Sequence, residues 1–487
     1  MTNLSDLFPA GAGKQVSFTA AETIGAGKIV QVKTDGQIEL PQSTGDLTGL
    51  IGTPGYLDEN TANFLAMDYD TDENRYLALI VNSSSNIEAY TGTASGLDIT
   101  WSGKGEIINP SGGAGSPPQG LICRFMPTLG LFLIAFRDQG SSDYLGCCYG
   151  EMAADGSISA SGIVHLSTAV AADFSAAEHV GEGLPILQYQ NSSGHPYVVA
   201  LGESGGSPTF GTELALTSTV AAYFGRWAAV YDPDRARVIS TYATSTGLYA
   251  VEVDVTSGGV VSKGTTSSEL KTTANADECN LAYDTVNDKM LYAFKDDANS
   301  SYGTCFVLSN SSGTFSAGTS VVFNSGSTPV ISPAYTTGVI VLAFESDATA
   351  IEGTGVTISG TTVTSWTPVT LDAIRGNSIN TIYDPDTGKV YVAYSCPLDS
   401  SAREVGLTPG GSTTTDYIGV SEASISSAAS GNVTLKGGIL TSGVSGLTPG
   451  VDYYGQSDGS ISTTSTSPAV KIGKALSATS INLEYQS

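Results

Sequence analysis

An apolar strand, an acidic turn and a second apolar strand recur along most of the chain. Residues 227–243 read WAAVYDPDRARVISTYA, residues 280–294 read NLAYDTVNDKMLYAF, and residues 379–394 read INTIYDPDTGKVYVAY. Looser copies of the same pattern occupy residues 64–81, 121–136, 184–200 and 329–344. Two apolar runs joined by Asp, Pro, Asn and Gly predict a β-hairpin. The chain therefore holds about seven copies of one hairpin.

The spacing of the hairpins predicts how they assemble. Tyr231, Tyr283, Tyr335 and Tyr383 follow one another at steps of 52, 52 and 48 residues. A step of roughly 50 residues matches one four-stranded blade of a β-propeller. The segments between the hairpins alternate polar and apolar residues, as half-exposed outer strands do. We predict an all-β fold with about seven blades, with inner strands at 64–69, 227–232, 279–284 and 379–384 and an irregular blade near residue 184.

The last copy of the repeat is incomplete. Residues 396–412, CPLDSSAREVGLTPGGS, are too short and too rich in turn residues for a full outer hairpin. A propeller leaves no exposed sheet edge when the opposite end of the chain supplies the missing strand. We predict that residues 46–57, DLTGLIGTPGYL, pair with the last blade as that strand.

Composition and charge exclude several classes of protein. The chain carries 47 Asp and Glu against 20 Lys and Arg, a net charge of −27, which repels phosphate backbones and argues against a nucleic-acid partner. No apolar run approaches the roughly 18 residues of a membrane span, and the N-terminus lacks the pattern of a signal peptide. The six cysteines show no CxxC and no nearby histidine, so we expect buried free thiols and folding in a reducing cytoplasm.

The acidic turns raise the question of a metal site. Asp70 and Asp72, and likewise Asp384 and Asp386, place alternate carboxylates in a loop, as the first half of a calcium loop does. Neither loop has the later bidentate Glu. Hairpin turns require the same residue types for their backbone angles. We expect no cofactor, and calcium at these four residues stays the alternative.

Candidates for catalysis and ligand binding are few. His165, His179 and His195 lie in no nucleophile or zinc motif, so we predict no enzymatic activity. A glycosidase needs only two carboxylates at a distance that the sequence does not reveal. Trp101 and Trp366 each end an outer strand, where blade packing is the first interpretation and stacking on a sugar is the second.

The two ends of the chain differ from the repeats and together predict a small β-domain. Residues 18–41 and 416–487 are short strands separated by glycine turns, and Tyr453 and Tyr454 follow the turn GLTPG at 446–450. Alternation predicts that one of these tyrosines enters the core and the other faces a partner. A single core is expected to contain Val30, Val32, Ile38, Ile418, Val433, Leu435, Ile472, Leu476, Ile481 and Leu483.

The order of motifs at the ends resembles a small β-domain of virion proteins of tailed bacteriophages, especially tail-fibre and other appendage proteins. The matching stretches are 26–36, 417–420, 446–454, 458–464 and 472–483, about a hundred residues in all. The resemblance implies a propeller, residues 59–411, inserted into a sandwich-like or barrel-like domain formed by residues 1–58 and 412–487. Residues 1–58 also hold the predicted closing strand.

This resemblance implies a structural virion protein, assembled in the host cytoplasm, that serves as a fibre, an appendage or a capsid decoration. The end domain would anchor to other virion proteins and to copies of itself, and the propeller would be displayed for adhesion to a host glycan or receptor. Two alternatives remain: a propeller glycosidase or depolymerase that acts on host surface polysaccharide, and a cellular protein-interaction propeller.

Overall fold

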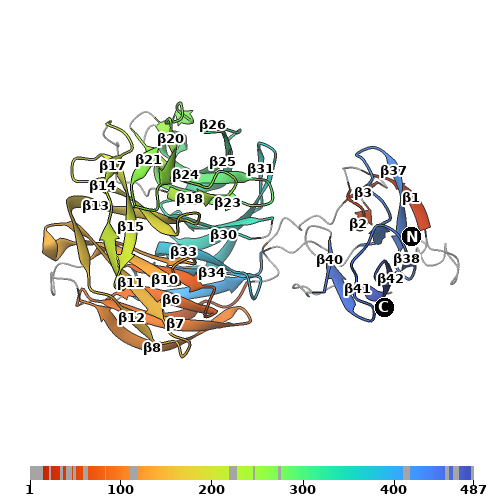
Figure 1. Ribbon diagram of the computed structural model, residues 1–487, viewed down its shortest axis with the longest axis horizontal. Helices are drawn as coiled ribbons and strands as arrows, with labels where there is room; N and C mark the ends of the chain where they lie inside the picture. The colour runs from red at the N-terminus through yellow and green to blue at the C-terminus, as the bar shows by residue number, and fades with distance from the viewer. Residues whose placement is uncertain are drawn as a thin grey trace. The chain divides into compact units, whose positions relative to one another are not determined.

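The chain divides into two compact units, which are described separately. The computed structural model describes residues 15–20, 24–32, 37–39, 47, 51–58, 64–82, 84–109, 118–218, 228–244, 247–272, 276–336, 338–409, 417–455, 460–463 and 471–483 (Figure 1). The larger unit is residues 47–409, and the smaller unit combines residues 1–46 and 410–487. In the described part of the chain, no helix has the length and apolar character needed to cross a membrane.

The larger unit is a β-propeller whose inner strands form a closed ring. Among the described residues the ring has seven inner strands: β5 (Leu65–Asp70), β9 (Gln119–Met126), β13 (Val164–His179), β18 (Ala228–Asp232), β23 (Ala276–Asp284), β28 (Ile331–Tyr335) and β33 (Asn377–Asp384). Each contacts the next around the ring, and β33 contacts β5. The predicted all-β propeller of about seven blades is confirmed.

Each blade continues outward as antiparallel strands. The first three blades add β6 (Arg75–Val81), β7 (Ile87–Ser95) and β8 (Asp98–Ile108); β10 (Leu131–Asp138), β11 (Tyr144–Met152) and β12 (Ile158–Ala160); and β14 (Leu184–Asn191), β15 (Pro196–Ser204), β16 (Ser207–Phe210) and β17 (Leu214–Ala215). The next three add β19 (Arg237–Ala243), β20 (Gly247–Val255), β21 (Val261–Lys263) and β22 (Lys271–Thr272); β24 (Lys289–Asp296), β25 (Tyr302–Ser311), β26 (Thr314–Ala317) and β27 (Val321–Ser327); and β29 (Ile340–Ser346), β30 (Ala350–Ser359), β31 (Thr362–Ser365) and β32 (Val369–Asp372).

The second strand of each blade is apolar on both faces because neighbouring blades cover both sides of it. In β29 every residue from Ile340 to Ser346 is buried. Leu77 and Leu79 of the first blade pack with Phe132 and Ile134 of the second in one apolar cluster. A strand buried on two faces reads as a continuous apolar run, which is why these strands dominate the repeat in the sequence.

The third blade corrects the sequence interpretation. Residues 184–200, which were expected to be an inner hairpin, form the second and third strands β14 and β15. The inner strand is the later half of β13, which pairs with β14, while its earlier half pairs with β11 of the preceding blade. The later half of β13 carries Ser175, Ala176 and Glu178 instead of an apolar run, so it was not recognised as an inner strand.

The last blade consists of β33, β34 (Lys389–Cys396), β35 (Ser401–Leu407) and the N-terminal strand β4 (Gly55–Asp58). Antiparallel pairs join Tyr56 to Arg403 and Gly55 to Glu404, and an isolated bridge joins Ile51 to Leu407. The predicted pairing of an N-terminal strand with the last blade is confirmed. The observed strand ends at Asp58, one residue after the predicted range 46–57.

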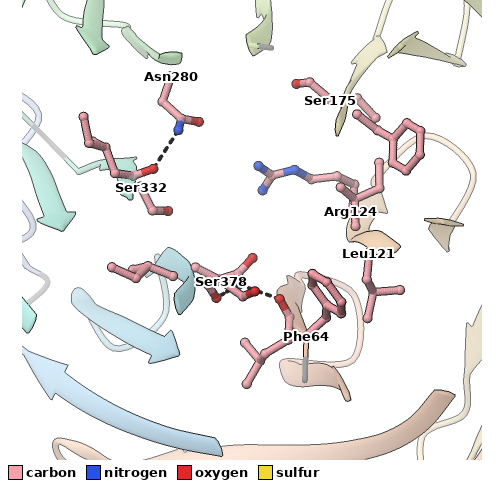
Figure 2. A pocket seen from close by; sticks show the side chains of 15 residues that line it. Phe64, Leu121, Arg124, Ser175, Asn280, Ser332 and Ser378 are labelled. Atoms are coloured by element: carbon pink, nitrogen blue, oxygen red, sulfur yellow. Dashed lines mark hydrogen bonds between the residues drawn. The ribbon is translucent and has the colours of Figure 1, made fainter. Parts of the chain in front are cut away.

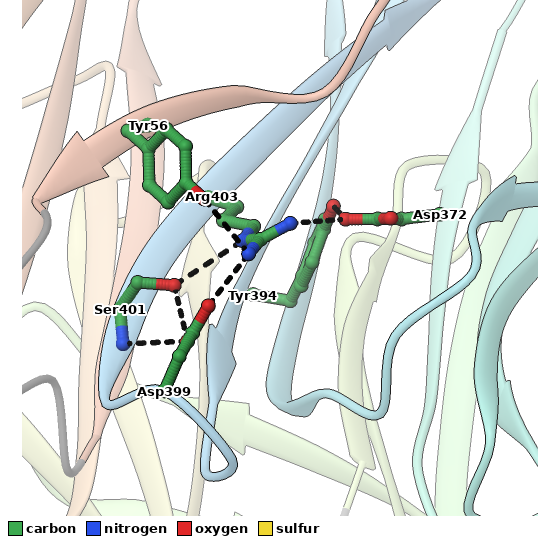
Figure 3. Close-up of polar contacts among 6 residues, drawn as sticks. All are labelled: Tyr56, Asp372, Tyr394, Asp399, Ser401 and Arg403. Carbon is green, nitrogen blue, oxygen red and sulfur yellow. Dashed lines mark hydrogen bonds and ion pairs between the residues drawn. The ribbon is translucent and has the colours of Figure 1, made fainter.

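Arg403 fixes this closure through several polar contacts (Figure 3). Its guanidinium donates to the hydroxyl of Tyr56 at 3.0 Å, to the carboxylate of Asp372 at 3.2 Å and to that of Asp399 at 2.6 Å. Tyr394 donates to the same oxygen of Asp372 at 2.7 Å. One cation thus connects the closing strand, the last blade and β32 of the sixth blade.

Within its described residues, the smaller unit contains two five-stranded sheets. Their strands are β1 (Gln15–Thr19), β37 (Ser430–Leu435), β36 (Gly419–Ser421), β2 (Ile29–Val32) and β3 (Ile38–Glu39) in one sheet, and β38 (Ile439–Leu440), β42 (Ser480–Leu483), β41 (Lys471–Ser477), β39 (Asp452–Gly455) and β40 (Ile461–Ser462) in the other. The C-terminal strands β37 and β36 therefore lie between the N-terminal strands β1 and β2 in the first sheet.

The expected single core of this unit is wrong, because two apolar clusters are present. Ile472, Ile481 and Leu483 pack with Ile29 and Val420 in one cluster. The other cluster contains Val30, Ile38, Val433 and Leu435, with Ile418 packed against it. Neighbouring residues of β2 point to opposite faces, so Ile29 and Val30 enter different clusters. Val32 and Leu476, also expected in the core, are exposed. Of the stretch 458–464 that carries part of the resemblance, the structure describes residues 460–463.

Candidate functional site

The acidic turns of the repeat cap themselves and join neighbouring blades. Asp384, almost fully buried, accepts the backbone N–H groups of Asp386 and Thr387 on one oxygen and the Tyr76 hydroxyl at 2.6 Å on the other. Tyr69 donates to Asp386 at 2.7 Å. The tyrosines belong to the first blade and the carboxylates to the last, so these contacts hold two blades together.

The same arrangement recurs elsewhere in the ring. Asp70 accepts the backbone N–H groups of Asp72 and Glu73. Tyr283 of the fifth blade bonds to Asp232 of the fourth, and burial is the main reason that the pKa of Tyr283 is raised. Among the described residues, no group of three or more His, Cys, Asp or Glu side chains could hold a metal ion. Of the four calcium candidates, Asp70 and Asp384 accept backbone N–H groups of their own turns, and Asp384 and Asp386 accept tyrosine hydroxyls of the first blade.

Both candidate tryptophans pack onto glycines inside their blades. Trp366 is buried, and a Cβ added to Gly355 would lie 2.1 Å from its ring. Trp101 covers Gly92 in the same way and donates from Nε1 to Glu404 at 3.4 Å. Trp366 is therefore a packing residue without an accessible stacking face, which corrects its candidacy as a ligand platform.

The tyrosines after GLTPG divide as their alternation predicts. Tyr453 is buried in the smaller unit, and its hydroxyl accepts the backbone N–H of Thr448 at 2.9 Å. Tyr453, the first tyrosine of the pair, therefore fixes the turn that precedes it. Tyr454 is partly exposed.

The cysteines are six buried free thiols, as predicted. Burial raises the pKa of Cys148 and of Cys305 to about 12, so neither is a reactive thiolate near neutral pH.

The cavity that does gather polar groups lies where the inner strands begin, along the propeller axis (Figure 2). Its volume is about 170 Å³, and its lining comes from six of the seven blades: Phe64, Leu65, Gly120, Leu121, Ile122, Arg124, Phe174, Ser175, Ala176, Asn280, Ile331, Ser332, Ser378, Ile379 and Asn380. Arg124 is the charged residue of this lining, in a chain whose net charge is −27.

Most polar side chains of the cavity already connect adjacent inner strands. Asn280 donates to the carbonyl of Ile331 at 2.6 Å, and Asn380 donates to that of Leu65 at 3.1 Å. Ser175 accepts the backbone N–H of Ala229 at 2.9 Å. These bonds make the lining rigid, which fixes the positions of the remaining polar groups.

Backbone irregularities lie in the lining of the cavity at Gly120 and Ser378, and two residues before the lining residue Asn280. Glu278 and Ser378 adopt positive φ angles of 54° and 48°, and Gly120 has a φ of 61°. The pairing of β23 with β24 and of β33 with β34 shifts register at the first two. Positive φ is unfavourable for residues with a Cβ, and β-bulges of this kind are common beside functional sites.

Arg124 differs from the other polar residues of the lining because its guanidinium projects into the cavity. Figure 2 shows it directed toward the space between Asn280, Ser332 and Ser378. Its ionic partner is Asp68 at 4.0 Å, whose oxygens also accept the backbone N–H groups of Phe125 and Tyr69. Burial raises the pKa of Asp68, and Arg124 opposes this shift. The sequence analysis missed Arg124; the available signal was a lone cation in the apolar run LICRFM.

Comparison with known proteins gives no family. No protein-family model and no curated protein sequence matches the chain. Similar solved structures include a protein from Lactobacillus plantarum, with 11% identity over 74% of this chain and 98% of that chain and a TM-score of 0.48. The Dos1 propeller has 11% identity, covers 75% of this chain and 96% of its own, and has a TM-score of 0.44. The propeller domain of Cps50 (Swd1) from Myceliophteria thermophila has 10% identity, coverages of 73% and 98%, and a TM-score of 0.45. At these values the assignment of the propeller rests on its own strand order and ring contacts.

Proposed function

We propose that the chain is a non-enzymatic structural protein of a tailed-phage particle, in which the smaller unit attaches to the particle and the propeller is carried for adhesion or decoration. The composite smaller unit is the observation that carries this proposal. β2 pairs with β36 and β1 pairs with β37, although the whole propeller lies between these strands in the sequence. Both ends of the propeller thus return to one base.

The sequence motifs also support the assignment of attachment to the smaller unit and of display to the propeller. The turn GLTPG and the strands of IGKALSATSINL, which carry the resemblance to phage appendage domains, both lie in this base. The repeated motifs of the propeller instead serve blade packing. The five stretches that carry the resemblance therefore all lie in the smaller unit.

The base also offers a surface for protein partners. Ile439 in β38 is 55% exposed and Leu476 in β41 is 51% exposed, and these two strands flank β42 in one sheet. Apolar side chains of this size gain free energy when a partner covers them. Other virion proteins or copies of the same chain are the proposed partners, because virion appendages are usually symmetric oligomers.

The test uses substitutions at exposed positions, which leave the fold intact. Ile439→Glu and Leu476→Glu place charge on the base, and Val322→Glu is the matched control on an exposed position of the propeller. Mass spectrometry of purified particles should find the wild-type chain and the control at normal copy number and the base variants strongly depleted. Equal incorporation of all variants, or absence of the wild-type chain from particles, would refute the proposal. Release of reducing ends from host polysaccharide would favour the depolymerase alternative.

A further inference from the structure

We propose that the axial cavity binds the carboxylate of an acidic sugar through Arg124. This inference deepens the proposed function by naming the ligand of the displayed propeller, and it rests on that function for its biological meaning. Ligand binding itself involves only the cavity, so the purified chain is sufficient to test it.

The first support is that Arg124 departs from the repeat. The pairing of each inner strand with the second strand of its blade identifies equivalent positions. In the second blade, Arg124 pairs with Leu133. The residues at the same position in the third, fourth, fifth and last blades are Ala177, Val230, Ala282 and Ile382. Four blades thus carry an aliphatic residue where the second carries a guanidinium. Blade packing at this position does not require a cation.

The first blade has the other exception, Asp68, at the equivalent position. An ion pair between Arg124 and Asp68 is the simplest explanation of both residues. The distance of 4.0 Å and the 50% exposure of Arg124 argue that this pair is weak. The Asp68 oxygens are also engaged by two backbone N–H groups. Most of the five N–H donors of the guanidinium therefore remain for a ligand in the cavity.

The second support is the chemistry of the lining. A planar guanidinium matches a carboxylate with two parallel hydrogen bonds. No carboxylate belongs to the lining described for the cavity, although Asp68 lies 4.0 Å from Arg124. The guanidinium of Arg124 is the charge that an anion meets within this lining. The hydroxyls of Ser332 and Ser378 lie on the side that Arg124 faces.

Size and the two phenylalanines favour a sugar over a bare anion. A cavity of about 170 Å³ is larger than a simple carboxylate requires and has the scale of one sugar ring. Phe64 and Phe174 contribute apolar surface beside the serines and asparagines. A uronic acid presents hydroxyls, an apolar ring face and one carboxylate, which together match this mixed lining.

Isothermal titration calorimetry with D-glucuronate tests the proposal, with glucose and acetate as probes that lack the carboxylate or the ring. We expect glucuronate to bind the wild-type chain at least about tenfold more tightly than either probe, because charge-assisted hydrogen bonds are strong. Arg124→Met should weaken glucuronate binding by at least about tenfold, and Arg124→Lys should also weaken it because the planar fork is lost. Arg137→Met, on β10 and outside the lining, is the matched control and should bind as the wild type does.

Circular dichroism checks that each variant is folded, and Arg124→Lys keeps the test valid where Arg124→Met fails this check. The proposal is overturned by absence of glucuronate binding, by equal binding of glucose or acetate, or by folded Arg124 variants that bind normally. Particle incorporation separates this result from the proposed function. Arg124→Met should enter particles at normal copy number, whereas failure of the proposed function would appear as absence of the wild-type chain from particles.

Discussion

Glu404 makes the stability of the propeller depend on pH in a direction that the structure defines. This residue lies in β35 opposite Gly55 of the closing strand and is 5% exposed. Burial raises its pKa from the ordinary 4.5 to about 7, although hydrogen bonds from Trp101 and from the backbone of Ile99 oppose the shift. The protonated form is therefore favoured in the folded state.

The sign follows from proton linkage. Between pH 4.5 and pH 7 the folded chain holds a proton at Glu404 that the unfolded chain has released, so stability falls as the pH rises through this range. A rise of the pKa from 4.5 to about 7 corresponds to about 3 kcal/mol in the free energy of unfolding. Above pH 7 this penalty is complete, and below pH 4.5 it is absent.

Glu404→Gln keeps the shape and an acceptor for Trp101 and removes the titration. We expect the variant to be more stable than the wild type by up to about 3 kcal/mol at pH 8, and to approach it near pH 4.5. Urea unfolding followed by circular dichroism at pH 4.5, 6 and 8 measures the difference. Glu151→Gln, an exposed position on β11, is the control for removal of one negative charge. A stability gain that is independent of pH, or one that grows as the pH falls, would refute this reasoning.

Three further predictions concern the contacts between blades. Arg403→Met removes the cation that joins the closing strand to two blades and should lower the free energy of unfolding by about 2–4 kcal/mol; an unchanged midpoint in urea would contradict this. Tyr76→Phe removes the hydroxyl that donates to the second oxygen of Asp384 and should cost about 1–3 kcal/mol in the same assay, against Tyr144→Phe on β11 as the control. Deletion of residues 47–58 exposes the edge of β35 and should lower the melting temperature and increase light scattering on heating; a chain that melts like the wild type would show that this strand is dispensable.

The propeller was predictable because its second strands are buried on both faces. That burial leaves long apolar runs, and the hairpin turns of the first, fourth, fifth and last blades add an Asp that accepts backbone N–H groups, so the period is visible without alignment. The third blade is harder to recognise because its inner strand contains Ser175 and Glu178 and its turn contains no Asp. The signal of a blade depends on its second strand more than on its inner strand.

The core of the smaller unit and the axial cavity could not be predicted from the sequence, for different reasons. Alternation identifies which residues of a strand share a face, but it does not identify what covers that face, so Val30 and Ile472 were assigned to one cluster. The cavity collects its lining residues from six blades. Distances between them depend on ring closure, which no local pattern encodes, and Arg124 appeared only as an interruption of an apolar run.

Closure of the propeller also affects the base, through the entropy of the chain. β2 and β36 must pair although roughly 390 residues separate them, and a flexible loop of that length is costly to close. Pairing of Gly55 with Glu404 shortens the effective loop to the two connecting segments, roughly 40 residues in all. Because the cost rises with the logarithm of loop length, this tenfold reduction is worth about 2 kcal/mol. The closing strand therefore stabilises the base, although it is not part of it. In a chain with an open propeller, the pairing of β2 with β36 should be lost under milder denaturing conditions than in the wild type.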